Sequence, residues 1–332
     1  MRGYQVRRYQ QPLELAELAE PEVGPGDVLV EVAAAGLNPL DEKIRDGEFT
    51  ALLRYTAPFT LGHDVAGTVV ATGRDVTAYA VGDEVWSRPR DGRIGTFADR
   101  IAIDQADVSL RPTRISMTEA AALPLVALTA WQALVEIGRL RAGQKVLVHA
   151  GAGGVGTVAI QLAKHLGATV ATTVSAANAD LVRELGADVV IDHRTQRFED
   201  VVRDYDLVLD GVGAEHVLRS LTVVRPGGTV VGIAGPPTPR FARDAGLNPL
   251  LRPVFGVLSR KVRRLARSRG VDFRFLFMRA DGAQLAQLAA LVDAGAIRPV
   301  VSATVDFAEL PETLTRVASG GGRGKTVVTM SR

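Results

Sequence analysis

The segment from Lys145 to Gly167 constrains the fold of this chain more than any other. It starts with a short apolar run, Val146 to Val148, and continues with Gly151, Gly153 and Gly156 at the spacing G-x-G-x-x-G. Apolar residues then recur at helical spacing, at Val155, Val158, Ala159, Leu162, Ala163 and Leu166. A strand, a glycine turn and a helix in this order predict a dinucleotide-binding unit, in which a pyrophosphate lies on backbone N–H groups at the start of the helix.

The rest of the chain divides into regions that differ in their pattern of expected strands and helices. Residues 1 to 122 contain short β-like runs broken by Gly, Pro and Asp, which predict a mostly antiparallel, barrel-like domain. Residues 123 to 268 alternate strands with helices, so we expect an α/β fold with a doubly wound parallel sheet. Residues 269 to 332 contain one amphipathic helix and end in a strand. We expect them to return to the first domain, which makes the nucleotide domain an insertion.

Within the nucleotide domain the sequence predicts particular elements. We expect a helix at 177–185 and strands at 169–174, 188–191, 207–209 and 229–233. The last of these strands is expected to follow a turn at Gly227-Gly228.

Composition excludes several classes of site. The chain has 332 residues, 47% of them hydrophobic and 23% charged, which is ample for two domains with cores of their own. It has no cysteine, so disulfides, thiolate metal sites and cysteine nucleophiles are excluded. The most apolar run, 120–135, is shorter than the roughly 20 residues of a membrane span. The first residues lack the apolar core of a signal peptide. We therefore expect a cytoplasmic protein without a membrane partner.

Basic residues gather in one stretch although the net charge is only +2. They are Arg252, Arg260, Lys261, Arg263, Arg264, Arg267 and Arg269. No aromatic ladder for base stacking interleaves them, so we expect no nucleic-acid partner. We interpret the stretch as a solvated surface, with a phosphate-facing rim or an anionic substrate site as the alternatives.

The end of the second expected strand bears on the choice of cofactor. NAD-binding folds place a carboxylate there, about 20 residues past the glycine loop, to bind the ribose 2′-OH. In this chain no acid occurs before Asp180. Ser175 and Asn178 could donate hydrogen bonds to a 2′-phosphate, and His193-Arg194 could add positive character from the next strand end. We therefore predict NADPH as the cofactor. A strand-end histidine bonded to the backbone is the alternative for His193.

Several separated segments resemble the medium-chain dehydrogenase/reductase superfamily, specifically its zinc-free quinone oxidoreductase (zeta-crystallin-like) branch. Besides the glycine segment they are GLNPLDEKIRDG at 36–47, PFTLGHDVAG at 58–67, AALPLVALTAWQAL at 121–134, ELGADVVID at 184–192 and the stretch 221–228. The resemblance covers essentially the whole chain. It implies a GroES-like first domain and a homodimer.

The resemblance also implies the absence of metal. Asn38 and Leu125 stand where the superfamily's alcohol dehydrogenases have two zinc thiolates, and only His63 of the usual ligands remains. Catalytic zinc needs three protein ligands, so we expect no metal and a structural, hydrogen-bonded His63. Without a metal the hydride acceptor must already be electron-poor, as quinones and carbonyl-conjugated alkenes are.

The resemblance implies a set of site residues. Asn38 would orient the substrate or the nicotinamide, and Thr129 would bind the nicotinamide end; a turn residue and a helix-cap hydroxyl are the alternatives. The pyrophosphate would contact Ala152, Gly153, Gly154 and Val155, and the 2′-phosphate Ser175 and His193. The nicotinamide side would be lined by Gly211, Val212, Gly213, Ile233, Ala234, Gly235, Leu276 and Phe277. Lys43 and Lys325 match positions near the cofactor, with ordinary surface lysines as the alternative.

No protein acid follows from the sequence. Related enoyl-thioester reductases use a tyrosine as proton donor, whereas Phe49 occupies that neighbourhood here and Tyr55 is the nearest candidate. We expect protonation from water. The predicted function is an NADPH-dependent quinone or enone reductase. The alternatives are an enoyl-thioester reductase whose basic stretch at 252–269 binds phosphates of the thioester arm, and a non-catalytic NADPH-binding protein with a structural or sensing role.

Overall fold

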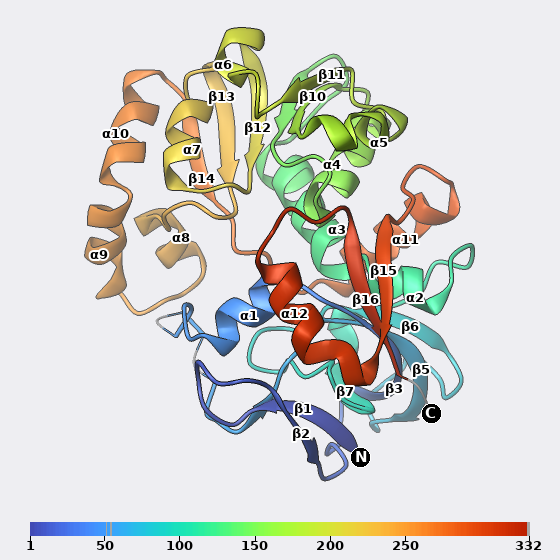
Figure 1. The fold of residues 1–332 in the computed structure, drawn as a ribbon. Helices are drawn as coiled ribbons and strands as arrows, with labels where there is room; N and C mark the ends of the chain where they lie inside the picture. Colours follow the sequence, from blue (N-terminus) through green and yellow to red (C-terminus); the bar gives the residue numbers. More distant parts are fainter. Residues whose placement is uncertain (51, 54, 331–332) are drawn as a thin grey trace. The chain divides into compact units, whose positions relative to one another are not determined.

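The computed structural model describes residues 1–50, 52–53 and 55–330, and the chain divides into two compact units (Figure 1). Unit 1 comprises Met1–Leu128 and Arg279–Arg332, and unit 2 comprises Thr129–Met278. The second unit is therefore inserted in the first, as the sequence predicted.

Unit 1 is built mainly from antiparallel strands. Its larger sheet has the order β15-β16-β3-β5-β6-β8, with β7 also paired to β3, and its smaller sheet has the order β2-β1-β4. The strands are β1 (Arg2–Val6), β2 (Glu14–Glu17), β3 (Asp27–Gly36), β4 (Phe59–Thr60), β5 (Asp64–Thr72), β6 (Glu84–Ser87), β7 (Arg100–Asp104), β8 (Val108–Leu110), β15 (Val301–Asp306) and β16 (Lys325–Thr329). β16 pairs antiparallel with β3, with Val328 opposite Ala35, so the end of the chain completes the first unit as expected.

The helices of unit 1 are short apart from one near the end of the chain. They are α1 (Pro39–Arg45), α2 (Met117–Ala121), α11 (Gly282–Asp293) and α12 (Leu310–Ala318). A further helix, α3 (Pro124–Trp131), crosses the boundary between the units and continues into a π-helical turn, Gln132–Ile137.

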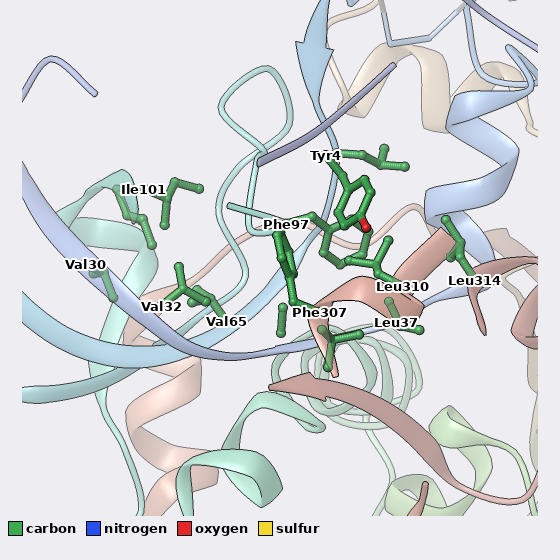
Figure 2. Close-up of a cluster of buried hydrophobic side chains, with 14 of the residues drawn as sticks. Tyr4, Val30, Val32, Leu37, Val65, Phe97, Ile101, Phe307, Leu310 and Leu314 are labelled. Atoms are coloured by element: carbon green, nitrogen blue, oxygen red, sulfur yellow. The ribbon is translucent and has the colours of Figure 1, made fainter. Parts of the chain in front are cut away.

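The core of unit 1 lies between its sheets and α12. Figure 2 shows side chains from β1, β3, β5 and α12 meeting around Phe97. The rings of Tyr4 and Phe307, from opposite ends of the chain, have centroids 4.9 Å apart. Full burial of a large apolar side chain contributes about 1.5–3 kcal/mol. This core is what holds the two ends of the chain in one unit.

Unit 2 is a doubly wound parallel sheet. Its strand order is β11-β10-β9-β12-β13-β14, and every neighbouring pair is parallel. The strands are β9 (Lys145–Val148), β10 (Thr169–Val174), β11 (Val189–Asp192), β12 (Tyr205–Asp210), β13 (Val224–Gly232) and β14 (Asp272–Phe275). The order reverses between β9 and β12, and ligands of such sheets bind outside the carboxyl ends of the strands at this point.

The helices of unit 2 follow the strands. They are α4 (Gly154–His165), α5 (Ala179–Glu184), α6 (Phe198–Val201), α7 (Ala214–Ser220), α8 (Pro239–Asp244), α9 (Leu251–Leu258) and α10 (Arg260–Ser268). The last three lie between β13 and β14, where α10 packs on β14 and α7 (Figure 1).

Two details differ from the sequence prediction. The unit boundaries fall at Thr129 and Arg279 rather than at the expected 123 and 269. The second shift matters because β14 pairs with β13, with Phe273 opposite Val230. An end at 268 would remove this edge strand from its sheet. In addition, Gly227-Gly228 lies inside β13 rather than ahead of it, close to a register shift in the pairing with β12.

Candidate active site

The glycine turn of unit 2 has the geometry that the motif predicts. β9 runs into the turn, and α4 follows with Gly153 as its N-cap. A Cβ on Gly151 would lie 2.0 Å from Oγ1 of Thr172, and one on Gly156 would lie 2.4 Å from the carbonyl oxygen of Ala150. Any side chain at these two positions would collide with its neighbours, so glycine is required there.

The residues expected at the pyrophosphate, Ala152 to Val155, lie at the start of α4. Helix geometry leaves the first N–H groups without intrahelical acceptors, and the helix dipole adds positive potential at the same end. Because α4 is twelve residues long, this potential is well developed. The turn therefore fits a pyrophosphate, and the close packing at Gly151 and Gly156 keeps the backbone within reach of one.

The other expected cofactor residues of unit 2 lie along one edge of the sheet. Each follows the carboxyl end of a strand: Ser175 after β10, His193 after β11, Gly211 to Gly213 after β12, Ile233 to Gly235 after β13, and Leu276-Phe277 after β14. Backbone N–H groups connect neighbours across this edge. Those of His193, Ile233 and Leu276 donate to the carbonyls of Val174, Asp210 and Gly232 at 3.2, 2.9 and 2.9 Å. The structure thus assembles residues that are about 100 positions apart in the chain.

The pair expected at the 2′-phosphate is brought together by strand register. Val174 lies opposite Asp192, so Ser175 and His193 are the next residues of adjacent strands. The Asn178 side chain donates to Oγ of Ser175 at 3.3 Å, and His193 is exposed. Asp180, the first acid after β10, forms an ion pair with Arg183 at 3.0 Å. The strand end therefore carries no free carboxylate that would repel a 2′-phosphate.

A buried polar cluster around Asp210, the last residue of β12, was not predicted from the sequence. One carboxylate oxygen of Asp210 accepts from the Val212 N–H at 3.0 Å. The other accepts from Oγ of Ser220 at 2.7 Å and lies 2.9 Å from Nδ1 of His216. His149 extends the cluster, with its Nε2 3.1 Å from Oγ of Ser220. These bonds fix the Gly211–Gly213 loop. Polar residues at the ends of apolar strands were a sequence signal for His149 and Asp210, but nothing local indicated their partners in α7.

Burial sets the charges in this cluster. It lowers the pKa of His149 to about 3 even though Asp210 acts in the opposite direction, so the imidazole is neutral at neutral pH. Burial alone would raise the pKa of Asp210, but hydrogen bonds from His216 and Ser220 and the nearby imidazoles hold it below its ordinary value. The carboxylate is therefore ionised beside a neutral histidine.

Among the described residues, this cluster is the one group of side chains close enough together to ligate a metal ion. Possible ligand atoms of His149, Asp210 and His216 lie within 4.8 Å of one another. The hydrogen bonds just given account for this proximity, since each of the three side chains is already partnered within the cluster.

A second buried polar cluster lies in unit 1, at the start of α1. Asn38 is the N-cap of this helix, and Pro39 occupies its first position, where a missing N–H costs nothing. The Asp41 carboxylate accepts from the Asn38 N–H at 2.9 Å and lies 2.6 Å from Nδ1 of His63. His63 is fully buried, and within the described chain its Nε2 has no hydrogen-bond partner. The geometry agrees with a structural, hydrogen-bonded histidine.

Lys325, the first residue of β16, extends into this cluster from 287 residues away in sequence. Its Nζ donates to Oδ2 of Asp64 at 3.0 Å, to the carbonyl of Leu37 at 2.8 Å, and to Oδ1 of Asn38. An ammonium has three donors, so all of them are used. Lys325 is only 7% exposed, which sets aside the surface-lysine alternative for this residue.

Asp64 is the centre on which the cluster converges. Besides Lys325, it accepts from Nδ2 of Asn38 at 2.9 Å and from the Leu125 N–H at 2.7 Å. Asn38 and Leu125 are the two positions that, by resemblance, replace zinc thiolates. Both are tied to one carboxylate, and that carboxylate is neutralised by a buried ammonium.

The remaining predicted residues are placed as follows. Lys43 is exposed on α1 and forms an ion pair with Glu48 at 3.1 Å. Thr129 is buried inside α3, so it is not a helix-cap hydroxyl. Phe49 packs on the core of unit 1. Burial raises the pKa of the Tyr55 hydroxyl to about 12, which makes it a weak proton donor.

A cavity of about 550 Å³ in unit 1 is separate from these residues. It is lined by residues of β1, β3 and β7 and by the ends of the chain, among them Arg2, Glu31, Asp99 and Arg100. None of the predicted site residues is among those that line it. We assign it no part in the site.

The two units and their clusters define a two-domain dehydrogenase, and comparison with known families agrees. Residues 24–113 match the family described as alcohol dehydrogenase GroES-like domain, and residues 185–328 match the family described as zinc-binding dehydrogenase. The mouse (Mus musculus) mitochondrial NAD(P)H oxidoreductase RTN4IP1 is 36% identical over 325 residues, which cover 92% of this chain and 82% of the relative. The chloroplastic NADPH-dependent alkenal/one oxidoreductase of Arabidopsis thaliana is 33% identical over 323 residues, covering 94% and 74%.

Solved structures show the same fold. The quinone oxidoreductase of Coxiella burnetii superposes with a TM-score of 0.85 at 28% identity and covers 100% of this chain and 99% of that one. A mycobacterial protein solved in complex with NADPH superposes with a TM-score of 0.82 at 28% identity and covers 99% and 100%. The chain belongs to the medium-chain dehydrogenase/reductase superfamily, in its zinc-free quinone oxidoreductase branch.

Proposed function

We propose that this chain is an NADPH-dependent oxidoreductase that transfers hydride, without zinc, to a quinone or an α,β-unsaturated carbonyl compound. The relatives support the cofactor and the substrate class, because they are named as NAD(P)H, NADPH-dependent alkenal/one and quinone oxidoreductases. The observation that carries zinc independence is the buried Lys325–Asp64 pair with Asn38 and the Leu125 N–H around it.

Different residues of unit 2 are proposed to bind different parts of the cofactor. The N-terminus of α4 would hold the pyrophosphate, Ser175 and His193 the 2′-phosphate, and the loops after β12, β13 and β14 the nicotinamide side. Bound NADPH would supply the hydride. The Asp210 cluster keeps the Gly211–Gly213 loop in place through the bond from Val212 N–H. Asn38, Thr129, Lys43 and Lys325 remain our proposed contacts for the substrate or the cofactor.

The donor set of unit 1 does not suit zinc. Three protein ligands around an open position are needed, and two of the possible ligands in the cluster, His63 and Asp41, already contact each other at 2.6 Å. Asp64, the one carboxylate common to Asn38 and Leu125, already holds the Lys325 ammonium at 3.0 Å. A divalent cation there would have to displace a buried like charge. The acceptor must therefore be electrophilic on its own, and water remains the proposed proton source.

The test is NADPH oxidation by the purified protein with a panel of quinones and enones, combined with elemental analysis for zinc. We expect turnover that survives incubation with a chelator, in protein that contains substoichiometric zinc. Loss of activity on chelation with recovery on added Zn²⁺ would contradict zinc independence. Tight NADPH binding without turnover of any acceptor would instead support the non-catalytic binding protein.

An enoyl-thioester reductase is the second candidate, and the exposed basic residues of α10 are the observation that favours it. Rates with an enoyl thioester and with a quinone, measured at equal NADPH, separate the two functions. A thioester kcat/KM well above that of every quinone and simple enone would establish this candidate.

We also propose a homodimer located in the cytoplasm, both as in the sequence prediction. Among the described residues no helix combines the length and the apolar character needed to cross a bilayer. Light scattering on the purified protein and fractionation of cells that express it test these two proposals.

A further inference from the structure

Helix α9 presents an apolar face to water. Leu250, just ahead of the helix, and Val254, Val257 and Leu258 within it are 77%, 50%, 74% and 59% exposed. Residues three and four apart lie on the same side of a helix, so these four side chains form one face. Phe255, in the same helix, is buried. A contiguous exposed aliphatic face of this kind marks an interaction site more often than an isolated exposed residue does.

The next helix, α10, adds a strong positive charge beside this face. Arg260, Lys261, Arg264 and Arg267 are exposed, whereas Val262 and Ala266 are buried against the body of unit 2. No Asp or Glu occurs between Asp244 and Asp272, so no nearby residue of this stretch offsets the charge.

The two helices are held together as one surface. The side chain of Arg263 donates from Nε to Oγ of Ser259 at 3.1 Å and from Nη2 to the Gly256 carbonyl at 2.9 Å. Ser259 is fully buried at the junction of α9 and α10. The aliphatic face and the basic face are thus fixed relative to each other, and we call them together the α9–α10 surface.

We propose that the α9–α10 surface binds the surface of an anionic lipid bilayer. Aliphatic side chains on one face of a helix insert at the boundary of headgroups and acyl chains, and neighbouring Lys and Arg side chains attract anionic headgroups. The two consecutive helices, joined at the buried Ser259, supply both components. This proposal replaces the sequence-based expectation of no membrane partner, and it concerns peripheral attachment, not a membrane span.

Other occupants fit the surface less well. A two-fold contact between copies would bring each basic helix next to the same helix of the partner, and a stable interface takes roughly 20–30 residues on each side. Single-stranded nucleic acid is bound by stacking on aromatic side chains, and the exposed apolar residues here are all aliphatic.

The test uses the full chain with vesicles of two compositions, phosphatidylcholine alone and phosphatidylcholine with about 30% phosphatidylserine, in a flotation assay. We expect the protein to float with the anionic vesicles only and to be released at about 1 M salt, where the Debye length is about 3 Å. The triple variant Arg260→Glu/Lys261→Glu/Arg264→Glu should bind at least tenfold more weakly, because each basic residue near the surface contributes roughly fivefold.

Matched variants separate this surface from general charge and hydrophobicity. Arg74→Glu/Arg203→Glu/Arg323→Glu changes the net charge equally at exposed arginines elsewhere and should bind like the native chain. Val257→Ser/Leu258→Ser should weaken binding, whereas Val81→Ser/Leu110→Ser, at exposed apolar residues of unit 1, should not. Far-UV circular dichroism and urea unfolding should be unchanged in all four variants, which shows that they are folded.

Several results would overturn the proposal. These are equal flotation with both vesicle types, equal binding by the two triple variants, or absence of binding to anionic vesicles at low salt. A change in molar mass by light scattering in Val257→Ser/Leu258→Ser would assign the face to a subunit interface instead. None of these results depends on the substrate, so the proposed function can fail independently.

Discussion

The buried cluster around Asp64 in unit 1 and the one around Asp210 in unit 2 both keep a carboxylate away from water, but they stabilise it differently. Asp64 is paired with the Lys325 ammonium at 3.0 Å. Asp210 is surrounded by a backbone N–H, a hydroxyl and an imidazole, with a neutral His149 close by. The Asp64 carboxylate therefore has a full positive charge beside its neutral donors Asn38 Nδ2 and Leu125 N–H, whereas the Asp210 carboxylate is held by a backbone N–H, a hydroxyl and an imidazole.

The difference also concerns how each cluster is assembled. Asp64 and Lys325 are separated by 261 residues, and β16 must dock on β3 before they meet. In the Asp210 cluster, His149 and Asp210 stand at the ends of neighbouring parallel strands, and His216 and Ser220 come from α7, the helix that follows β12. Loss of one donor should consequently be severe in unit 1 and graded in unit 2, and the following experiments examine this contrast.

The largest effect is expected from Lys325→Met, which leaves the Asp64 carboxylate buried without its partner. Breaking a buried pair on one side costs about 3–5 kcal/mol. Urea unfolding followed by Trp86 fluorescence in a Trp131→Phe background reports on unit 1, because Trp86 is its fully buried tryptophan.

The double variant Lys325→Met/Asp64→Asn should recover part of this loss, since it removes both charges. The control is Lys164→Met, whose partner Asp188 and own side chain are about one-third exposed; it should cost about 1 kcal/mol or less. Equal destabilisation by Lys325→Met and Lys164→Met would contradict the view that Asp64 depends on its buried ammonium partner.

The next effect is a pH dependence that originates in unit 2. The folded pKa of His149 is about 3, below the value of about 6.5 of an unfolded histidine, so the unfolded chain binds a proton first as the pH falls. The free energy of unfolding should therefore drop by about 2 kcal/mol from this residue between pH 7 and pH 5. The lowered pKa of Asp210 acts only in more acidic solution, below its unfolded value.

Urea unfolding of the native chain and of His149→Gln at pH 7 and pH 5 measures the contribution of His149 to the free energy of unfolding. The variant should lose less stability on acidification by about 2 kcal/mol. His165→Gln, at an exposed histidine of α4, is the control and should keep the native dependence. A native-like pH slope in His149→Gln would show that His149 is not the origin.

A smaller effect is expected from Gly156→Ala in the glycine turn. The new Cβ would lie 2.4 Å from the Ala150 carbonyl, and overpacking of this kind costs about 1–3 kcal/mol. Alanine regains about 1 kcal/mol in a helix, so a net loss of stability of about 0–2 kcal/mol should accompany weakened NADPH binding.

Calorimetric titration with NADPH and thermal unfolding measure the two consequences of Gly156→Ala. Gly322→Ala is the control, because a Cβ there meets nothing within 4 Å. Unchanged NADPH affinity in Gly156→Ala would argue that the turn does not need close backbone approach.

The smallest effect is expected at the end of β10 and β11. Ser175→Ala and His193→Ala should each lower the ratio of kcat/KM for NADPH over NADH by about tenfold, since a hydrogen bond to a charged group contributes about 1.5 kcal/mol. Steady-state rates with both cofactors test this, with His165→Ala as the control. An unchanged ratio in both variants would place the 2′-phosphate elsewhere.

Much of unit 2 could be predicted because the sequence patterns that specify its strands, turn and helices lie within short segments. The glycine spacing, the apolar runs and their alternation with helices are read within short windows, and the parallel sheet then brings every strand end to one edge. Ser175 and His193 were paired in this way. Gly227-Gly228 was placed ahead of its strand because two glycines are typical of turns, whereas here they lie inside β13.

The clusters themselves could not be derived. His149 and Asp210 are single polar residues at strand ends, and nothing in their neighbourhoods indicates that α7 brings His216 and Ser220 to them. Lys325 was expected near the cofactor, but no local pattern connects it to Asp64. The apolar face of α9 also required the structure, because an aliphatic run in sequence is as compatible with burial as with exposure.

The sequence by itself determined the order of the elements, the need for glycine in the turn after β9, the absence of thiolate ligands and the lack of an acid before Asp180. These are properties of residue type and short-range spacing. Only the tertiary structure decided that the Lys325 ammonium neutralises Asp64 between Asn38 and Leu125, and that His149 stays neutral. Charge states and ion pairs depend on burial and on distances of a few ångströms between residues far apart in the chain, and these are properties of the packed fold.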